Sequence, residues 1–158
     1  MKKMAVVLVL ILFLAPLPLL AGEKEDTKKE TSVTVGLYTW HFHSKNANNF
    51  NRLLAFTYDG WTVGWFNNSQ SNETIFAGYA FRTKRYSISE DEKWFVRGSI
   101  YLGVVYGYGD YLPTNVGGFS PYGLPTAEIG YKKLSLEIGV IPAPGSAGLI
   151  TGMLKYSF

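Results

Sequence analysis

The sequence contains no cysteine and only two histidines among its 158 residues. The missing thiols exclude a disulfide framework, a thiolate metal site and the attachment of a lipid to an N-terminal cysteine. Beyond residue 22 there is also no apolar run of the roughly 20 residues that a membrane-spanning helix needs. A small domain of this composition must take its stability from backbone hydrogen bonds and from the burial of apolar side chains.

The chain also lacks a strong charge of either sign. It has 15 basic and 12 acidic residues, and two of the lysines lie at its very beginning. Without Lys2 and Lys3 the count is 13 basic against 12 acidic residues, so the net charge falls from +3 to +1. The pI near 9.0 is therefore no argument for a nucleic-acid partner, and we expect none.

The first 22 residues have the order of a secretory signal peptide. Lys2 and Lys3 are followed by an apolar run over residues 4–20, and Ala21 and Gly22 offer small residues for cleavage. We expect residues 1–22 to be removed, residues 23–32 to form a flexible charged segment, and residues 33–158 to form the folded domain. The chain is thus expected to be exported.

Alternation of apolar and polar residues dominates the rest of the sequence and predicts strands. In residues 134–140, for example, Leu134, Leu136, Ile138 and Val140 alternate with serine, glutamate and glycine. Eight strands follow from this pattern, at about 33–43, 50–59, 61–67, 73–83, 94–107, 121–131, 134–142 and 148–158.

Three features favour a membrane barrel over a soluble, lipocalin-like one. The chain is expected to be exported, it ends in an aromatic residue, Phe158, and its aromatic residues gather near strand ends, as in the girdles of outer-membrane barrels. The predicted fold is therefore all-β, an eight-stranded antiparallel transmembrane β-barrel in the cell outer membrane. The girdle residues are Tyr38, Trp40, Trp61, Trp65, Trp94 and Tyr106.

The connections between these strands alternate in length. Asp59-Gly60 is a typical two-residue hairpin pair and Lys132-Lys133 is equally tight, whereas 44–49, 67–72, 108–120 and 143–147 are longer. Short turns lie on the periplasmic side of such barrels and long loops outside. The segment 84–93 is long for a periplasmic turn, and we expect a short helix or a bulge at residues 87–93.

Several short motifs resemble those of a known family. Tyr38-Thr39-Trp40-His41 resembles the first-strand Thr-Trp-His of the PagP-type lipid A palmitoyltransferases. Phe66-Asn67-Asn68-Ser69, followed by Ala77-Gly78-Tyr79, is similar to that family's Phe-x-Asp-Ser and Ala-Gly-Tyr at the same spacing. The likeness spans most of residues 36–158, and three further pairs match in order: Leu124-Pro125, Gly130-Tyr131 and Ile141-Pro142.

The resemblance implies an outer-membrane acyltransferase that moves a fatty acyl chain from a phospholipid to lipid A, without a cofactor. The family's essential His, Asp and Ser correspond to His41, Asn68 and Ser69 here. Neutral imidazole is a suitable base for this chemistry. Phospholipid and lipopolysaccharide are the implied partners of a monomeric barrel in the outer membrane.

The chain departs from the family at two points. Asn68 replaces the family's Asp, so it can orient the imidazole or donate to an oxyanion but supplies no charge, and Asn68→Asp is expected to raise activity. The family's N-terminal amphipathic helix also has no counterpart, because residues 23–32 are too short and too evenly charged.

Further residues follow from strand alternation and from the resemblance. Ala80, Gly78 and Phe76 are the predicted acyl-chain pocket, with Ala80 where the family has a glycine at the floor. An alanine there predicts a chain slightly shorter than palmitoyl. Pro125 and Pro142, which interrupt backbone pairing at adjacent strand ends, are the predicted lateral lipid entry.

Other interpretations of the same residues stay open. His41 is also a plausible hydrogen-bonded interior histidine, residues 67–69 a simple turn, and His41-x-His43 an incomplete metal pair for which no third ligand is evident. The rival to an enzyme is a structural or lipid-holding barrel, for instance one encoded by a phage or mobile element. A pore is disfavoured because inward Phe95, Tyr101 and Met153 would fill so narrow a barrel. We expect four further inward charges to form a lumenal ion-pair network: Arg97, Glu128, Glu137 and Lys155.

Overall fold

A computed structural model describes residues 29–42, 47–109, 112, 114–141 and 148–158. The predicted signal peptide with its cleavage site, His43 and Pro142 lie outside this part of the chain. No helix in the described residues is long and apolar enough to cross a membrane. The strands are β1 (Thr31–His41), β2 (Leu54–Tyr58), β3 (Trp61–Asn67), β4 (Glu73–Arg82), β5 (Tyr86–Ser87), β6 (Trp94–Tyr106), β7 (Phe119–Tyr131), β8 (Leu134–Ile141) and β9 (Leu149–Ser157).

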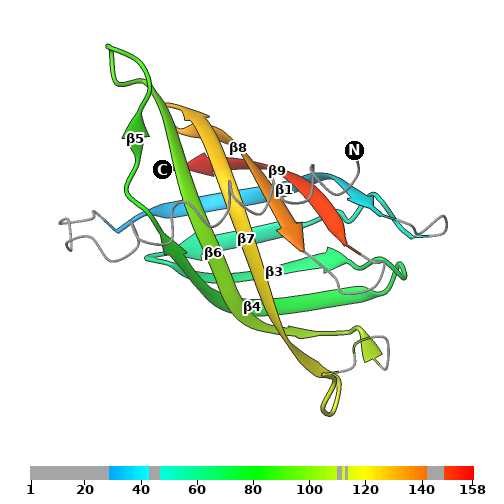
Figure 1. Ribbon diagram of the computed structural model, residues 1–158. Helices are drawn as coiled ribbons and strands as arrows, with labels where there is room; N and C mark the ends of the chain where they lie inside the picture. The colour runs from blue at the N-terminus through cyan, green and yellow to red at the C-terminus, as the bar shows by residue number, and fades with distance from the viewer. Residues whose placement is uncertain (1–28, 43–46, 110–111, 113, 142–147) are drawn as a thin grey trace.

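Eight of these strands close into a single antiparallel barrel (Figure 1). The sheet order is β4-β3-β2-β1-β9-β8-β7-β6, and a direct β4–β6 ladder joins its two ends. The short β5 pairs only with β6 and extends that strand's hairpin beyond the ring. The predicted all-β, eight-stranded barrel is therefore confirmed. The helix considered for residues 87–93 does not form, because Ser87 pairs with Phe95 and the residues between them make the turn that joins β5 to β6.

The strand boundaries agree with the predicted ones except around β1 and β2. β1 begins at Thr31, inside the segment that the sequence assigned to a flexible lead-in. β2 begins only at Leu54, because Arg52 adopts a left-handed backbone with φ of 41° and interrupts the extended chain. Residues 47–53 instead follow β1 irregularly, with Leu53 O and Asn49 O accepting from the amides of Gly36 and Thr39.

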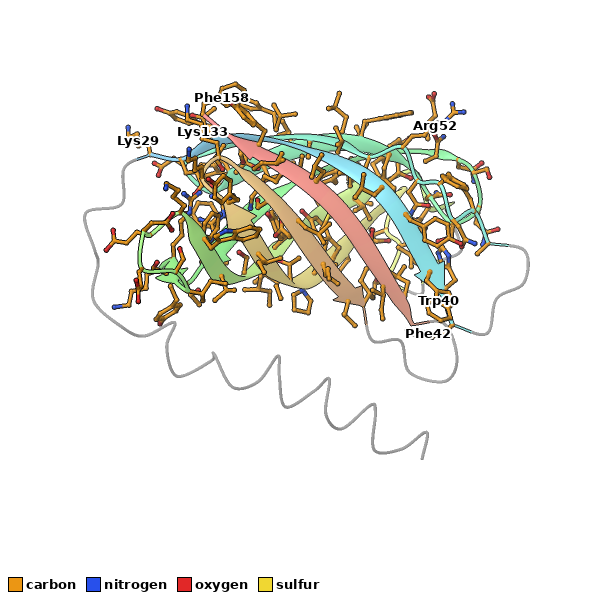
Figure 2. All side chains as sticks on the ribbon, turned by 90° about the horizontal axis from the view of Figure 1, so that it is seen from above. Lys29, Trp40, Phe42, Arg52, Lys133 and Phe158 are labelled. Atoms are coloured by element: carbon orange, nitrogen blue, oxygen red, sulfur yellow. The ribbon has the colours of Figure 1, made fainter. Side chains whose placement is uncertain are left out.

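The outer wall of the barrel is apolar, with aromatic rings paired near both of its ends. At one end Tyr38 meets Phe50 and Tyr106 meets Phe119, at centroid distances of 5.4 and 4.9 Å. Figure 2 shows Trp40, Phe42 and Arg52 at this end, with Lys29, Lys133 and Phe158 at the other. Two aromatic belts around an apolar band suit the two interfaces of a membrane. The opposite belt includes Trp61–Tyr79, Trp94–Tyr131 and Tyr156–Phe158.

The turns distinguish the two ends of the barrel. Asp59 and Gly60 have φ of 50° and 86°, as a type I′ hairpin turn requires, and Lys132 has φ of 53° in the other tight turn. Both turns, the β5 ribbon and the two described chain ends lie at one rim, which we call the turn rim. The described residues of the longer connections lie at the opposite rim, which we call the loop rim: 42, 47–53, 68–72, 107–109, 112 and 114–118.

The half of the barrel interior near the turn rim holds the predicted ion-pair network. Lys155 Nζ lies 2.7 Å from Glu128 and 3.3 Å from Glu137, and Arg97 donates to the same Glu128 oxygen at 2.7 and 2.9 Å. Hydroxyl groups donate hydrogen bonds to the other oxygen of each carboxylate: Ser135 donates to Glu128 and Thr126 to Glu137, each at 2.6 Å. Two acids and two bases buried together leave no net charge in this layer, which confirms the predicted network.

Glu30, just before β1, extends the network to the turn rim. It accepts from Arg97 at 2.6 and 3.1 Å, and Arg82 and Arg85 lie 3.6 and 3.4 Å away. Burial alone would raise the pKa of Glu30, but the hydrogen bonds and charge of Arg97, with the charge of Arg82, lower it from 4.5 to about 2. This carboxylate therefore fixes the start of β1 through its ionised form.

The low pKa of Glu30 predicts an acid-dependent contribution to stability. Because the folded pKa is below the unfolded one, the contribution is complete above about pH 4.5 and disappears as the pH falls towards 2. Glu30→Gln should lower the free energy of unfolding by about 1–3 kcal/mol at pH 7 and by much less near pH 2.5. Urea unfolding of the refolded barrel at both pH values measures the difference. Glu90→Gln, at an exposed position, is the control, and a pH-independent loss in Glu30→Gln would contradict the assignment.

Candidate functional site at the loop rim

His41 reaches the interior because β1 contains a bulge. Leu37 and Tyr38 both face outward, and the register of β1 against β9 shifts between Gly36 and Tyr38. The residues that follow are thereby turned over, so Thr39 and His41 point inward with 1% and 8% of their surface exposed. Without the extra residue, the alternation of Ser32, Thr34 and Gly36 would direct Tyr38 and Trp40 into the lumen.

Two side chains hold the imidazole of His41 at its two nitrogens. His41 Nε2 lies 3.0 Å from Ser69 Oγ, and His41 Nδ1 lies 3.0 Å from Asn49 Oδ1. Ser69 follows β3, whereas Asn49 lies in the irregular segment before β2. The structure thus brings together His41 and Ser69, as the sequence predicted, with Asn49 as a third member that the sequence did not indicate.

Backbone contacts between the two loops fix this arrangement. Asn48 N donates to Ser69 O at 2.9 Å, and its side-chain amide donates to Asn68 O at 3.3 Å. The backbone carbonyl of Asn49 accepts a hydrogen bond from Thr39 N at 2.9 Å. The serine and the asparagine therefore approach the histidine from opposite sides, each on a backbone that is itself hydrogen-bonded.

Asn68 is fully buried, and its side chain makes no hydrogen bond to the imidazole. Its Nδ2 donates to Thr74 Oγ1 at 3.0 Å and to Gly107 O at 3.1 Å. Its Oδ1 accepts from the amides of Gln70 and Asn72, at 2.9 and 3.1 Å. All of these bonds order the loop that carries Ser69, so the geometry gives Asn68 a positioning role and leaves the Nδ1 contact to Asn49.

Tyr108 lies beside Ser69 at the beginning of the β6–β7 connection. Burial raises the pKa of the Tyr108 hydroxyl, and its interaction with the Ser69 hydroxyl offsets part of that rise. The phenol therefore keeps its proton at neutral pH. A protonated hydroxyl next to a serine is suited to donate a hydrogen bond to an oxygen that gains negative charge there.

The three predicted acyl-pocket residues all face the lumen but lie at different depths. Phe76 lines a cavity of about 40 Å³, together with Tyr122, Leu124 and Met153. Gly78 pairs with Gly103, and Ala80, 4% exposed, lies nearer the turn rim, where its amide donates to Gly60 O. The cavity has room for a few water molecules and not for a long acyl chain.

Pro125, one residue of the predicted lateral entry, lies where the described pairing of β7 with β8 ends. Among the described residues, the β7–β8 ladder ends at Thr126 and Gly139, and residues 119–125 of β7 pair with β6. Pro125 is the first residue of β7 beyond the end of that ladder, whereas β8 keeps its pairing with β9 as far as Ile141. In Figure 1, β6 and β7 run on together past the end of β8. Pro142 cannot be placed, since it lies outside the described residues.

The described residues hold no group of three His, Cys, Asp or Glu side chains that could bind a metal ion. His43, the second histidine of the incomplete pair considered above, is outside them. Within the described part of the chain, His41 is held by oxygen atoms of Ser69 and Asn49, and both of its nitrogens are engaged.

These features define a closed eight-stranded barrel with a Ser-His-Asn arrangement at its loop rim. No family model matches the chain, and no curated protein matches it in sequence. Among solved structures, the crystal structure of the outer membrane enzyme PagL is similar, with a TM-score of 0.46 and 13% sequence identity. That match covers 82% of this chain and 98% of PagL. The resemblance to PagP-type enzymes that the motifs indicate stays a prediction.

The bonds of Asn68 predict different effects for two substitutions. Asn68→Ala removes both the donors and the acceptor, so the amides of Gln70 and Asn72 should exchange hydrogen about 10-fold faster or more. Asn68→Asp keeps the acceptor for these amides but turns a carboxylate towards Gly107 O, so it should loosen only the contact with the β6–β7 connection. On this geometry Asn68→Asp does not restore a carboxylate beside the imidazole. Residue-resolved hydrogen exchange in micelles checks this, and unchanged exchange in Asn68→Ala would refute the positioning role.

Proposed function

We propose that the protein is an outer-membrane enzyme that breaks an acyl ester of a membrane lipid, with Ser69 as nucleophile, His41 as base and Asn49 as the residue that orients the imidazole. The observation that supports this most directly is the pair of 3.0 Å contacts at the two nitrogens of His41. The acyl acceptor we propose is a hydroxyl group of lipid A, and the acyl donor is a phospholipid.

The hydrogen bonds favour one tautomer of His41. An amide oxygen only accepts, so Asn49 Oδ1 keeps the proton on Nδ1 and leaves the lone pair of Nε2 directed at the Ser69 hydroxyl. Nε2 then takes the serine proton as the oxygen attacks the ester carbonyl. Asn49 supplies orientation but no charge, as the asparagine does in the Cys-His-Asn variants of this arrangement.

The remaining steps need no other group. Collapse of the tetrahedral intermediate forms acyl-Ser69 and releases a lysophospholipid, whose oxygen takes the proton from Nε2. A hydroxyl group of lipid A then gives its proton to Nε2 and attacks the acyl-serine. As the bond between the acyl carbon and Ser69 Oγ breaks, Nε2 returns the proton to Oγ, which restores Ser69 and leaves the acyl ester on lipid A. The Tyr108 hydroxyl is suited to stabilise the oxyanion in both halves of the reaction.

A membrane location supports a lipid substrate. The apolar band with its two aromatic belts fits the outer membrane, and the site lies at the loop rim, beside one aromatic belt. An ester group of a lipid lies at this level, between the headgroup and the acyl chains.

The rival function, a structural or lipid-holding barrel, is favoured by one observation. The cavity of about 40 Å³ leaves no space for a fatty acyl chain in the conformation described. The Ser-His-Asn contacts would then only tie two loops together.

The membrane location predicts a heat-modifiable barrel in the outer-membrane fraction. Closed ladders should keep the chain folded in cold dodecyl sulfate, so unboiled and boiled samples should migrate differently in gels. Membrane fractionation of expressing cells, followed by this gel assay, makes the measurement. Recovery of the folded chain from the periplasm without detergent would exclude the membrane barrel.

The reaction predicts a distinct pattern of activity losses. Ser69→Ala and His41→Ala should lower the rate of acyl transfer by about 10³-fold or more, and Asn49→Ala by about 10²-fold or more. The assay mixes phospholipid and lipid A with the refolded barrel and measures acylated lipid A and free fatty acid by mass spectrometry. Gln70→Ala, next to Ser69 but with an exposed side chain, is the control.

The products of this assay separate the functions. Acylated lipid A supports the transferase, whereas free fatty acid alone shows that water is the acceptor and that the enzyme is a lipid esterase. Equal spectra for the unchanged protein, His41→Ala and an empty-vector sample would favour the structural barrel.

A further inference from the structure

The interior near the turn rim holds more basic than acidic side chains. Its ion pairs join three acids to four bases: Glu30, Glu128 and Glu137 with Arg82, Arg85, Arg97 and Lys155. The formal charge of this cluster is therefore positive by one. Burial and then the charge of Arg97 lower the pKa of Arg85, and the second effect reflects the crowding of positive charge. A buried charge without a counterion destabilises a fold, so this cluster is suited to take up an anion.

Glu30 is the carboxylate on which three of the bases converge, and it cannot bind all of them equally. Arg97 makes the two closest contacts, at 2.6 and 3.1 Å, and Ser157 Oγ donates to the same carboxylate at 3.3 Å. Arg85 Nη2 lies 3.4 Å from Glu30, and Arg82 Nη1 lies 3.6 Å from it, which is too far for a hydrogen bond. Arg82 is thus the arginine that this carboxylate serves least.

One edge of the Arg82 guanidinium makes no hydrogen bond to the described residues. Its Nε and Nη2 atoms are both buried and have no partner there, although buried polar groups are normally hydrogen-bonded. Nε and Nη2 present two parallel N–H groups, the fork that matches the oxygens of a carboxylate or a phosphate. Arg97 uses the same edge, since its Nε and Nη2 donate to Glu128 at 2.9 and 2.7 Å. The corresponding edge of Arg82 is therefore suited to a second oxyanion.

Ser99 supplies a further donor beside this edge. It stands opposite Arg82 in the β4–β6 ladder, so both side chains lie on the lumenal face of neighbouring strands. The Ser99 hydroxyl is buried and likewise has no hydrogen-bond partner in the part of the chain that the structure describes. Donors on two strands suit the several oxygens of a tetrahedral anion better than the two oxygens of a planar carboxylate.

Arg85 lies at the mouth of the cluster. Its side chain is 38% exposed, against 11% for Arg82. Its guanidinium lies 4.4 Å from the centroid of the Phe95 ring, and its hydrogen bond to Ser157 is long, at 3.4 Å. An anion in the water at the turn rim therefore meets Arg85 first. Because the donors of Arg82 are buried, binding there requires a side chain to move, and Arg85 is exposed enough to do so.

We propose that Arg82, Ser99 and Arg85 form a binding site for a phosphate group at the turn rim. The group belongs either to a soluble phosphate or to a phospholipid headgroup, which lies at the level of the aromatic belt of this rim. A bound phosphate would compensate the excess positive charge and accept hydrogen bonds from Arg82 and Ser99. This site lies at the opposite end of the lumen from His41 and does not depend on the proposed acyl chemistry.

Two probes test the site on the refolded barrel in a detergent that contains no phosphate. Inorganic phosphate is the soluble probe, and dihexanoylphosphatidic acid is the lipid probe, with dihexanoylglycerol as its phosphate-free control. Isothermal titration calorimetry at fixed ionic strength measures the affinities. Arg82→Lys keeps the charge but loses the fork, so it should weaken binding about 10-fold or more, and Ser99→Ala about threefold or more. Lys133→Gln, which removes an exposed charge of the same rim (Figure 2), is the matched control and should bind like the parent.

The outcomes separate the two sources of phosphate and the alternatives. Saturable binding of inorganic phosphate with these losses supports a site for a soluble anion, and binding of phosphatidic acid alone, with the same losses, supports a headgroup site. Absence of saturable binding for both probes overturns the inference. Binding that Arg82→Lys and Ser99→Ala leave unchanged, or that Lys133→Gln weakens as much as Arg82→Lys does, overturns it as well.

Two further variants keep the test independent of folding and of the reaction. Should Arg82→Lys fail to show heat-modifiable migration, Ser99→Ala is compared with Ser99→Thr, which keeps the hydroxyl and should bind like the parent. Ser69→Ala should bind phosphate with unchanged affinity, so a failed acyl-transfer assay leaves the result at the turn rim intact.

Discussion

Closure of the backbone hydrogen bonds is the constraint on which the rest of this structure depends. Hydrocarbon offers no water to an unpaired N–H or C=O group, so a sheet in a membrane must join its own edges. Here the β4–β6 and β1–β9 ladders do so with eight strands. A ring of eight strands is only wide enough for side chains to fill, and alternation then decides which residues fill it. Every interior feature of the protein is a consequence of that narrow lumen.

Charges in so narrow a space have to compensate one another. Glu128 and Glu137 bind Lys155, Arg97 binds Glu128, and Glu30 extends the network to the arginines at the turn rim. Removal of one partner would leave a buried charge without compensation, which costs far more than the intact network contributes. The ion pairs of this layer therefore hold the strands together, and their side chains fill the lumen at the turn-rim end. Chemistry that needs access to lipid is left with the loop rim.

Alternation in the sequence was sufficient to predict the barrel and the ion-pair network, because each inward position follows from its neighbours at a period of two. The resemblance to the PagP-type family, and not alternation, indicated His41 and Ser69, because both lie in motifs similar to that family's. Neither could indicate Asn49. This residue lies in a segment without alternation, and it reaches His41 only through the bulge at Leu37 and the irregular course of residues 47–53. Neither feature has a periodic signal, and the three asparagines at 48, 49 and 51 are equally suited to a loop. The Asp-to-Asn replacement at 68 likewise drew attention to a residue whose amide orders the loop instead of touching the imidazole.

The side chains of the site and those of the lumen below it differ in how far they would have to move for the proposed reaction. The Ser-His-Asn contacts are already formed, so little reorganisation is required at the reacting atoms, and such preorganisation is where much of the power of an enzyme lies. A row of packed rings, Tyr108, Phe66, Phe76 and Tyr122, instead fills the space that an acyl chain would need. An acyl chain can enter only by displacing rings, and the favourable burial of its methylenes must exceed that of the rings it moves.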